Sequence, residues 1–201
     1  MIANNIYLRT FKMHFSKKMT AFTLVELVTV IAVISILVVI SAPFFNSLLR
    51  SSESNQVFNR FYPALSDART QAATLHYAVG LCGSSDQASC DDDWNKGALL
   101  FIDQNQNRAL DNNETILNYY PTNIKYGQVS WRGAGTSHSQ VLLYTAERGR
   151  LDMSNGSFQY CAQENYWHRM IILPKIGNAR SSKDSNGDGI HETASGTNIS
   201  C

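Results

Sequence analysis

The chain has 201 residues, with 17 Lys or Arg, 16 Asp or Glu and a formal net charge of +1 at pH 7. The first 21 residues hold four of the basic residues and no acidic one, so the remainder carries 13 basic and 16 acidic residues and a net charge of −3. This acidic balance argues against a general nucleic-acid binder, although it is compatible with a local basic patch.

An apolar run from Phe22 to Ala42 follows the basic N-terminal segment. It holds 21 residues and a single charge, that of Glu26. An α-helix of this length spans about 31 Å, close to the hydrocarbon thickness of a bilayer. By the positive-inside rule, the basic flank predicts a cytoplasmic N-terminus and a chain that crosses the membrane once.

Glu26 is the unusual residue of this run, because a carboxylate within an apolar helix is costly and points to a function. The alternative is that Glu26 has no such function and only extends its carboxylate to the level of the lipid headgroups. The segment from Lys17 to Leu27 (KKMTAFTLVEL) resembles the class III signal of type IV pilins and pseudopilins, although the family usually has Gly where this chain has Ala21. The resemblance implies that a prepilin peptidase cuts between Ala21 and Phe22 and methylates the new terminus. It also implies that Glu26 meets the amino terminus of a neighbouring subunit during assembly.

The helical pattern continues beyond the apolar run. Pro43 predicts a kink, and apolar or small residues then recur at spacings of three and four from Phe58 to Leu75, which is one face of an α-helix. Pro63 lies inside this stretch and predicts a second kink or a break near Phe61–Tyr62.

Strand character begins at Gly97. Short runs rich in branched and aromatic residues alternate there with Gly, Asn, Asp and Pro, and they predict six strands: Ala98–Asp103, Ile116–Tyr120, Val129–Arg132, Val141–Thr145, Ser157–Ala162 and His168–Leu173. One long helix before six strands predicts an α+β fold, with the helix packed on an antiparallel β-sheet head. The chain then divides into a leader (1–21), a transmembrane or filament-core helix (22–42), an amphipathic continuation of the helix (43–81) and a globular β-rich periplasmic head (82–201).

The four cysteines are expected to form disulfides, because the head is predicted to lie in an oxidising compartment. They allow three pairings. Cys82 and Cys90 enclose a short polar loop, and a bond from Cys161 to the terminal Cys201 would hold a tail that otherwise frays. The pairing Cys82–Cys90 with Cys161–Cys201 is therefore favoured.

A second resemblance lies in the predicted head. The segments Trp94–Asp103, Gly149–Arg150 and Arg169–Gly177, with Cys161, resemble the H-type branch of the same superfamily. That branch holds the H-type minor pseudopilin of type II secretion and the FimU and FimT minor pilins. The resemblance implies a pilin-like architecture and, as partners, other minor and major pilins, an inner-membrane assembly platform and an assembly ATPase.

Two acidic stretches have the spacing of calcium loops. The first places oxygen-bearing side chains at positions 1, 3, 5, 9 and 12 of an EF-hand loop but has Arg108 where the sixth position needs Gly; these side chains are Asp103, Asn105, Asn107, Asp111 and Glu114. Solvated turns explain such a stretch equally well, because Asp, Asn and Gly dominate turns.

The second stretch runs from Asp184 through Asn186 and Asp188 to Glu192, with Gly at the sixth position but Ser195 at the twelfth. No cofactor or metal is expected overall, since a solvated turn is favoured here too. If a calcium ion is bound, Asp184, Asn186 and Asp188 are the predicted ligands.

A DNA-binding role is a further alternative. FimT-type competence pilins carry a basic Gly-Arg-x-Arg motif, and the matching stretch here is Gly177–Arg180, in which only the second Arg is present. Lys175 and Lys183 lie nearby and would join Arg180 in contacting phosphates. The acidic residues that follow oppose this role.

The sequence contains no Gly-x-Ser-x-Gly, His-Glu-x-x-His or Gly-rich phosphate loop, so no enzymatic activity is predicted. The predicted function is that of a minor pilin: a structural subunit that waits in the inner membrane, then joins a type IV pilus near its tip. The alternatives are the H-type minor pseudopilin of a type II secretion pseudopilus, a FimT-like DNA-binding pilin for natural transformation, and an anchored periplasmic protein that never polymerises.

Overall fold

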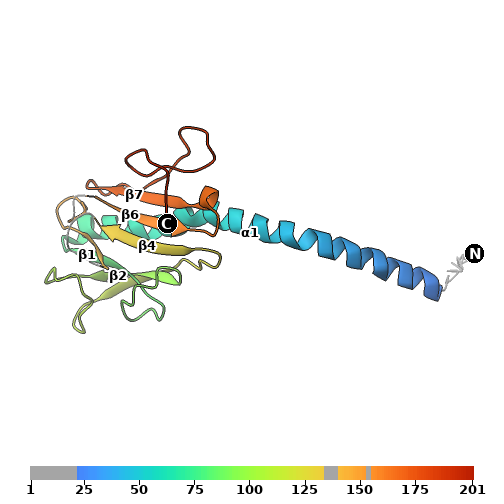
Figure 1. Ribbon diagram of the computed structural model, residues 1–201. Coiled ribbons are helices and arrows are strands. Elements are labelled where there is room, and N and C mark those ends of the chain that lie inside the picture. Colours follow the sequence, from blue (N-terminus) through green and yellow to red (C-terminus); the bar gives the residue numbers. More distant parts are fainter. Residues whose placement is uncertain (1–21, 134–139, 153–154) are drawn as a thin grey trace, which may run out of the picture. The chain divides into compact units, whose positions relative to one another are not determined.

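The computed structural model describes residues 22–133, 140–152 and 155–201 (Figure 1). The predicted leader therefore lies outside the described residues. The chain divides into two units, Met1–Pro43 and Phe44–Cys201. The helix α1 (Leu24–Leu75) begins in the first unit and ends in the second, and all strands belong to the second.

Helix α1 has 52 residues and is helical throughout, including at Pro43 and Pro63. The predicted break near Phe61–Tyr62 is therefore wrong. Pro63 faces solvent, while Phe61 and Ala64 beside it are fully buried. The carbonyl that loses its partner, that of Asn59 four residues earlier, lies at an exposed position where water can satisfy it. Packing of the neighbouring side chains thus holds the helix together across the proline.

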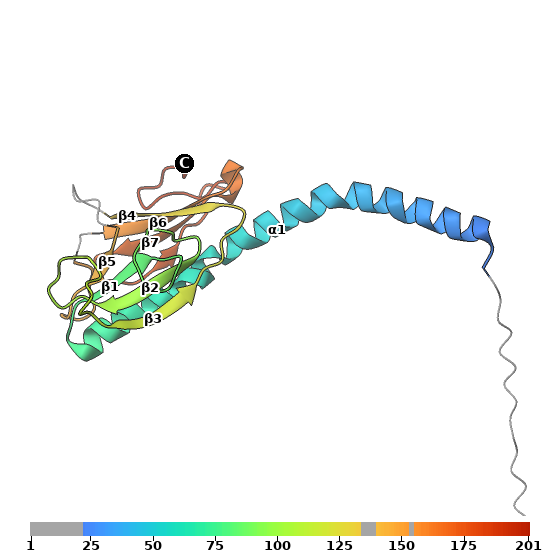
Figure 2. The same cartoon turned by 90° about the horizontal axis from the view of Figure 1, so that it is seen from below.

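The head contains two antiparallel four-stranded sheets, with strand orders β3-β2-β1-β5 and β4-β6-β7-β8. Figures 1 and 2 show them as two layers, with the C-terminal part of α1 lying along them. The strands are β1 (Val79–Gly83), β2 (Gly97–Ile102), β3 (Ile116–Pro121), β4 (Gln128–Gly133), β5 (Leu142–Tyr144), β6 (Asn155–Cys161), β7 (Arg169–Pro174) and β8 (Arg180–Ser181), with a short 3-10 helix η1 (Asn165–Trp167) before β7.

The α+β fold and the six predicted strands are confirmed, since the predicted runs coincide with β2 to β7. Two features differ from the expectation. The strands form two sheets rather than one, and α1 ends at Leu75, so that β1 occupies part of the range 43–81 that was assigned to helix. The helix stops where His76 adopts a left-handed backbone with φ of 57°.

One hydrophobic core joins α1 to both sheets. Phe158 of β6 lies at its centre, with its ring centroid 4.7 Å from Trp94, 5.0 Å from Phe61 of α1 and 4.8 Å from Trp131 of β4. Aromatic pairs at such separations stabilise a core beyond the area that they bury. One face of the helix from Val57 onward is therefore part of the core of the head.

Candidate functional site

The first described segment presents an apolar helical surface. Every side chain from Phe22 to Ser41 is exposed. The helix is long and apolar enough to cross a membrane. Unlike the part of α1 within the head, this part buries none of its apolar surface in the described chain, so it requires a lipid or protein environment to cover it.

The hydroxyl groups in this segment are satisfied within the helix. Thr29 donates to the carbonyl of Glu26 at 2.9 Å, Ser35 to that of Ile31 at 2.7 Å and Ser41 to that of Val38 at 3.1 Å. Such bonds to the preceding turn allow Ser and Thr to lie in apolar surroundings at low cost. These hydroxyls need no partner from outside.

The carboxylate of Glu26 is different, because it has no hydrogen bond or ion pair among the described residues. Thr23-Leu24-Val25-Glu26 has the spacing of a capping box. One half of the box is present, since the Glu26 N–H donates to Thr23 Oγ1 at 3.2 Å. The carboxylate itself remains available for a partner outside the described chain. Phe22, four residues earlier, is 77% exposed, and Ala21 lies outside the described residues.

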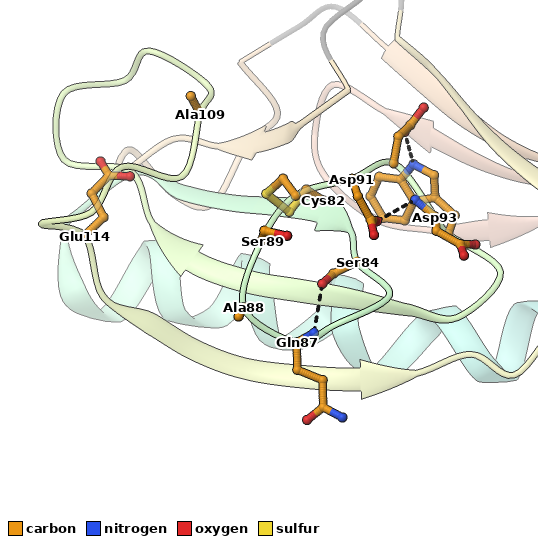
Figure 3. Close-up of a disulfide and its surroundings, with 12 residues drawn as sticks. Cys82, Ser84, Gln87, Ala88, Ser89, Asp91, Asp93, Ala109 and Glu114 are labelled. Carbon is orange, nitrogen blue, oxygen red and sulfur yellow. Dashed lines mark hydrogen bonds between the residues drawn. A yellow bond between two sulfur atoms is a disulfide. The ribbon is translucent and has the colours of Figure 1, made fainter.

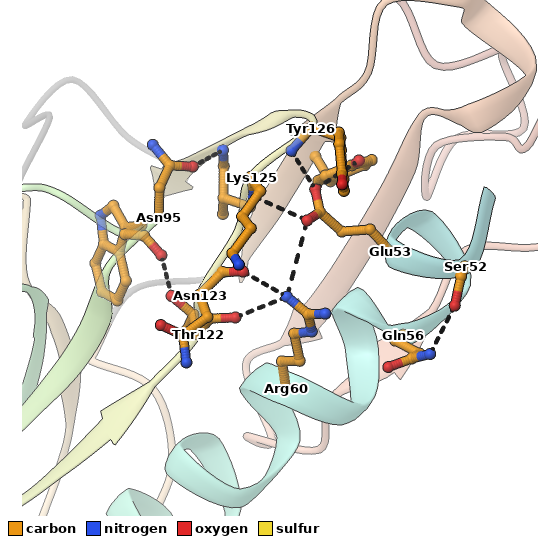
Figure 4. A network of polar contacts seen from close by, with 12 residues as sticks. Ser52, Glu53, Gln56, Arg60, Asn95, Thr122, Asn123, Lys125 and Tyr126 are labelled. Atoms are coloured by element: carbon orange, nitrogen blue, oxygen red, sulfur yellow. Dashed lines mark hydrogen bonds and ion pairs between the residues drawn. The ribbon is translucent and has the colours of Figure 1, made fainter. Parts of the chain in front are cut away.

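Within the head, a buried polar network ties α1 to the chain between β3 and β4 (Figure 4). Glu53 of α1 is only 4% exposed. Its carboxylate accepts hydrogen bonds from the N–H groups of Lys125 at 2.8 Å and Tyr126 at 2.9 Å, and from the hydroxyl of Tyr160 at 3.1 Å. Burial, then the charge and hydrogen bond of Glu53, raise the pKa of Tyr160, so its hydroxyl stays protonated as a donor.

Arg60, about two helical turns after Glu53, extends this network. Its Nη1 donates to the carbonyls of Thr122 at 3.0 Å and Asn123 at 2.7 Å and lies 3.9 Å from Glu53 Oε2. The sequence prediction missed Glu53. The spacing along the helix could have indicated its burial, because Glu53 lies four residues before Val57 and eight before Phe61, on the face of the helix that enters the core.

The structure has two disulfides, Cys82–Cys90 and Cys161–Cys201, which is the pairing that the sequence favoured. The first closes a polar loop that extends from β1 (Figure 3). Asp86 organises this loop by accepting the N–H groups of Ala88 at 2.9 Å and Ser89 at 2.8 Å. These hydrogen bonds hold the pKa of Asp86 well below its usual range, and the bond from Ala88 has the largest effect.

The second disulfide holds the C-terminus against the β4-β6-β7-β8 sheet. Cys161 ends β6, and Gln159 of the same strand donates to the carbonyl of Ser200 at 2.7 Å. Ile199 is buried in a small cluster with Met170 and Ile172. The chain end is thus fixed by a covalent bond, a hydrogen bond and apolar packing.

The first acidic stretch forms a turn whose carboxylates bind its own backbone. Asp103, which is fully buried, accepts the N–H groups of Asn107 at 3.2 Å and Arg108 at 2.9 Å. Glu114 accepts those of Gln104 at 2.9 Å and Asp111 at 3.1 Å. Both carboxylates thus bind the backbone of their own turn, and among the described residues neither belongs to a group of three acidic side chains that converge.

The second acidic stretch brings three carboxylates together. Asp184, Asp188 and Glu192 each place one oxygen within 4.8 Å of the others. The side-chain amide of Asn186 donates to Asp188 at 3.1 Å. The amide of Asn198, followed by the N–H of Ile190, holds the pKa of Asp188 below its usual range, so this group is ionised at neutral pH.

The three predicted phosphate-binding residues are not brought together. Arg180 and Lys183 line one hollow, but they share it with Glu192. Arg180 lies opposite Ile172 of β7, whereas Lys175 follows the far end of that strand. Along the strand direction, Lys175 and Lys183 are roughly 20 Å apart.

A long helix that is first exposed and apolar and then packs on antiparallel sheets defines a pilin-like protein. Residues 58–177, more than half of the chain, match the family described as Type II transport protein GspH. The chain belongs to this GspH family of minor pilins and pseudopilins.

The chain is also similar to solved structures of the Pseudomonas aeruginosa type IV minor pilin FimU. One crystal form is 17% identical, with a TM-score of 0.45 over 69% of this chain and 91% of that one. A second form is 16% identical, with a TM-score of 0.44 over 66% of this chain and 91% of that one. No curated protein sequence matches the chain.

Proposed function

We propose that this protein is a minor pilin, a structural subunit that is anchored in the inner membrane and then incorporated near the tip of a type IV pilus. The observation that carries the proposal is the exposed apolar segment from Phe22 to Ser41, together with the carboxylate of Glu26, which has no partner among the described residues. A membrane anchor alone needs no carboxylate, and such a group in an apolar medium is costly until an opposite charge meets it.

The opposite charge is supplied by processing. Cleavage by a prepilin peptidase between Ala21 and Phe22 frees an α-amino group, which is mostly cationic at neutral pH because its reference pKa is about 7.7–8.0. In the assembled filament, Glu26 of one subunit pairs with the methylated Phe22 terminus of a neighbour, and the apolar helices pack side by side. The assembly platform and the other pilins would be the direct partners.

Incorporation of the full-length chain into filaments tests this proposal. Filaments are sheared from cells that carry wild-type protein, Glu26→Ala or Ser35→Ala, and the subunit is quantified in the filament and membrane fractions. Ser35 is a matched control, because it lies in the same apolar stretch and its hydroxyl is bonded to Ile31 within the helix.

We expect Glu26→Ala to remain in the membrane at wild-type level but to fall at least about tenfold in filaments, which corresponds to a loss of about 1.4 kcal/mol or more in assembly. Ser35→Ala should assemble normally. Intact-mass analysis should show a mature chain that begins at N-methyl-Phe22. Normal assembly of Glu26→Ala, or a membrane chain that retains Lys17 and Lys18, would refute the proposal.

The second candidate is a pseudopilus component of a type II secretion system, which the name of the matched family favours. Cross-linking of the protein in cells that lack either the pilus or the secretion machinery distinguishes the two. A pilus component keeps its pilin partners when the secretion genes are deleted, and a pseudopilus component loses them.

A further inference from the structure

The segment after β8 forms loops beside β7 and ends at the disulfide-bonded Cys201 (Figure 1). Three acidic side chains from this segment converge there. One oxygen each of Asp184, Asp188 and Glu192 lies within 4.8 Å of the other two. Within the described part of the chain, no Lys or Arg forms an ion pair with any of the three. Their mutual repulsion is therefore not relieved by an ion pair.

Glu192 gives a second, independent indication of a missing partner. The residue is only 6% exposed. Its Oε2 accepts the N–H of Ser185 at 2.8 Å. Its Oε1 is buried and has no hydrogen-bond partner in the structure described. A carboxylate oxygen that loses its hydrogen bonds to water on burial and gains no new partner destabilises the folded protein. A cation in the space that the oxygen faces removes this cost.

We propose that Asp184, Asp188 and Glu192 bind one calcium ion. The ligand atoms that these three side chains offer are carboxylate oxygens, which a hard cation prefers. The side-chain oxygen of Asn186 lies in the same loop, where it accepts the N–H of Asp188 at 2.9 Å. Calcium binds oxygens at 2.3–2.6 Å, so it joins two carboxylates up to about 5 Å apart without rearrangement. Magnesium demands shorter distances and a regular octahedron and retains more of its water, so it fits an irregular loop of three carboxylates less well.

The loop is folded as such a site requires. Asp184 accepts the N–H groups of Gly187 at 2.7 Å and Gly189 at 2.9 Å, and both glycines have a left-handed backbone, with φ of 82° and 86°. A carboxylate has about four lone-pair sites, so these bonds leave acceptor positions free for an ion. Glu192, at the ninth position of the loop, supplies the carboxylate that an EF-hand would place at the twelfth.

The ion would couple the loop to the end of the chain. Asn198 donates its side-chain amide to Asp188 at 2.8 Å, and the N–H of Ile199 donates to the carbonyl of His191 at 2.9 Å. Glu192 and Asn198 also form a β-bridge. Calcium therefore stabilises the C-terminal segment together with the Cys161–Cys201 bond.

Titration of the full-length protein in detergent, stripped with EGTA, tests the site. Isothermal titration with calcium chloride should show one ion per chain, with a Kd in the range of about 10⁻⁴–10⁻³ M that is typical of modules outside the cytoplasm. Glu192→Gln should weaken binding about tenfold or more. Glu114→Gln is the matched control from the first acidic stretch and should bind within about twofold of wild type. No binding by wild type at about 10 mM calcium, or a loss confined to Glu114→Gln, would overturn the proposal.

A thermal-melting series separates metal binding from a purely structural role of Glu192. In EGTA, Glu192→Gln should melt at or above the wild-type temperature, because it removes one of three repelling charges and keeps an oxygen for Ser185. In calcium, the wild type should rise and Glu192→Gln should not. A variant that melts lower than wild type in both buffers would contradict the assignment. Equal shifts with magnesium chloride would overturn the choice of calcium.

Discussion

Replacement of Glu53 by Ala should be among the most damaging single changes in the head. It removes a carboxylate that is 4% exposed and that accepts two backbone N–H groups, from Lys125 and Tyr126, and the hydroxyl of Tyr160. Hydrogen bonds to a charged group each contribute about 1.5–3 kcal/mol, and each buried donor left without an acceptor costs about 1–3 kcal/mol. The desolvation of the charge offsets part of this. We expect the free energy of unfolding to fall by about 3–5 kcal/mol, as when a buried charged network is broken.

Two further variants should lower the free energy of unfolding by smaller amounts. Glu53→Gln keeps one acceptor oxygen but presents an amide donor toward a backbone donor, and it should cost about 2–3 kcal/mol. Tyr160→Phe removes a single donor and leaves the two backbone bonds, so it should cost about 1–1.5 kcal/mol. The expected order of damage is therefore Glu53→Ala, then Glu53→Gln, then Tyr160→Phe.

Chemical unfolding of the full-length protein in detergent, at pH 7 and with the disulfides intact, measures these differences. The fluorescence of Trp94 and Trp131 reports on the head, because both are buried in its core. Glu147 is exposed, and Glu147→Ala is the control that should stay within about 0.5 kcal/mol of wild type. If Glu53→Ala also stayed within about 1 kcal/mol, the network would not stabilise the head and the reasoning would be refuted.

Three other changes are expected to show clear effects in the same unfolding assay. Replacing Cys161 and Cys201 by Ser should cost about 4 kcal/mol, because the bond closes a loop of 40 residues; a negligible loss would count against it. Asp86→Asn should lower the free energy of unfolding at pH 7. Because folding lowers the pKa of Asp86, the ionised carboxylate stabilises the protein above the unfolded pKa of about 4, and this stabilisation is lost as pH falls below that value. The difference in unfolding free energy between Asp86→Asn and wild type should therefore disappear in acid. Pro63→Ala should raise stability by about 1–2 kcal/mol by restoring a helical hydrogen bond, and a destabilised variant would disprove this.

Much of the fold was predictable because its strands are local patterns. The six predicted runs are branched or aromatic segments bounded by turn residues, and local sequence suffices to identify such segments. Strand β1 (Val79–Gly83) was missed because its two glycines disfavour a strand. Tertiary packing explains why one of these positions is a glycine: a Cβ at Gly80 would be 2.4 Å from Cζ of Phe101. The partner strand, far along the chain, supplies a ring that only a glycine accommodates.

The polar sites show the same division between local and non-local information. The spacing of Asp184, Asn186 and Asp188 was visible in the sequence, since all three lie in one loop. The burial of Glu192 was not, because it depends on the tail, which packs through Ile199 and is held by Cys201. The division of the strands into two sheets was equally hidden, because strand order is set by pairings across long stretches of chain.

Glu26 and Glu53 carry the same group on the same helix, and their different surroundings separate the assembly role that we propose for Glu26 from the structural role of Glu53. The donors of Glu53 all come from its own chain, so that carboxylate is fully used once the head has formed. Glu26 receives no donor from the described chain, although its neighbouring hydroxyls are bonded within the helix. A charge left unpaired on an apolar surface gains most from a partner in another molecule. Loss of Glu53 should therefore harm each isolated protomer, whereas loss of Glu26 should leave the protomer folded and act only where protomers meet.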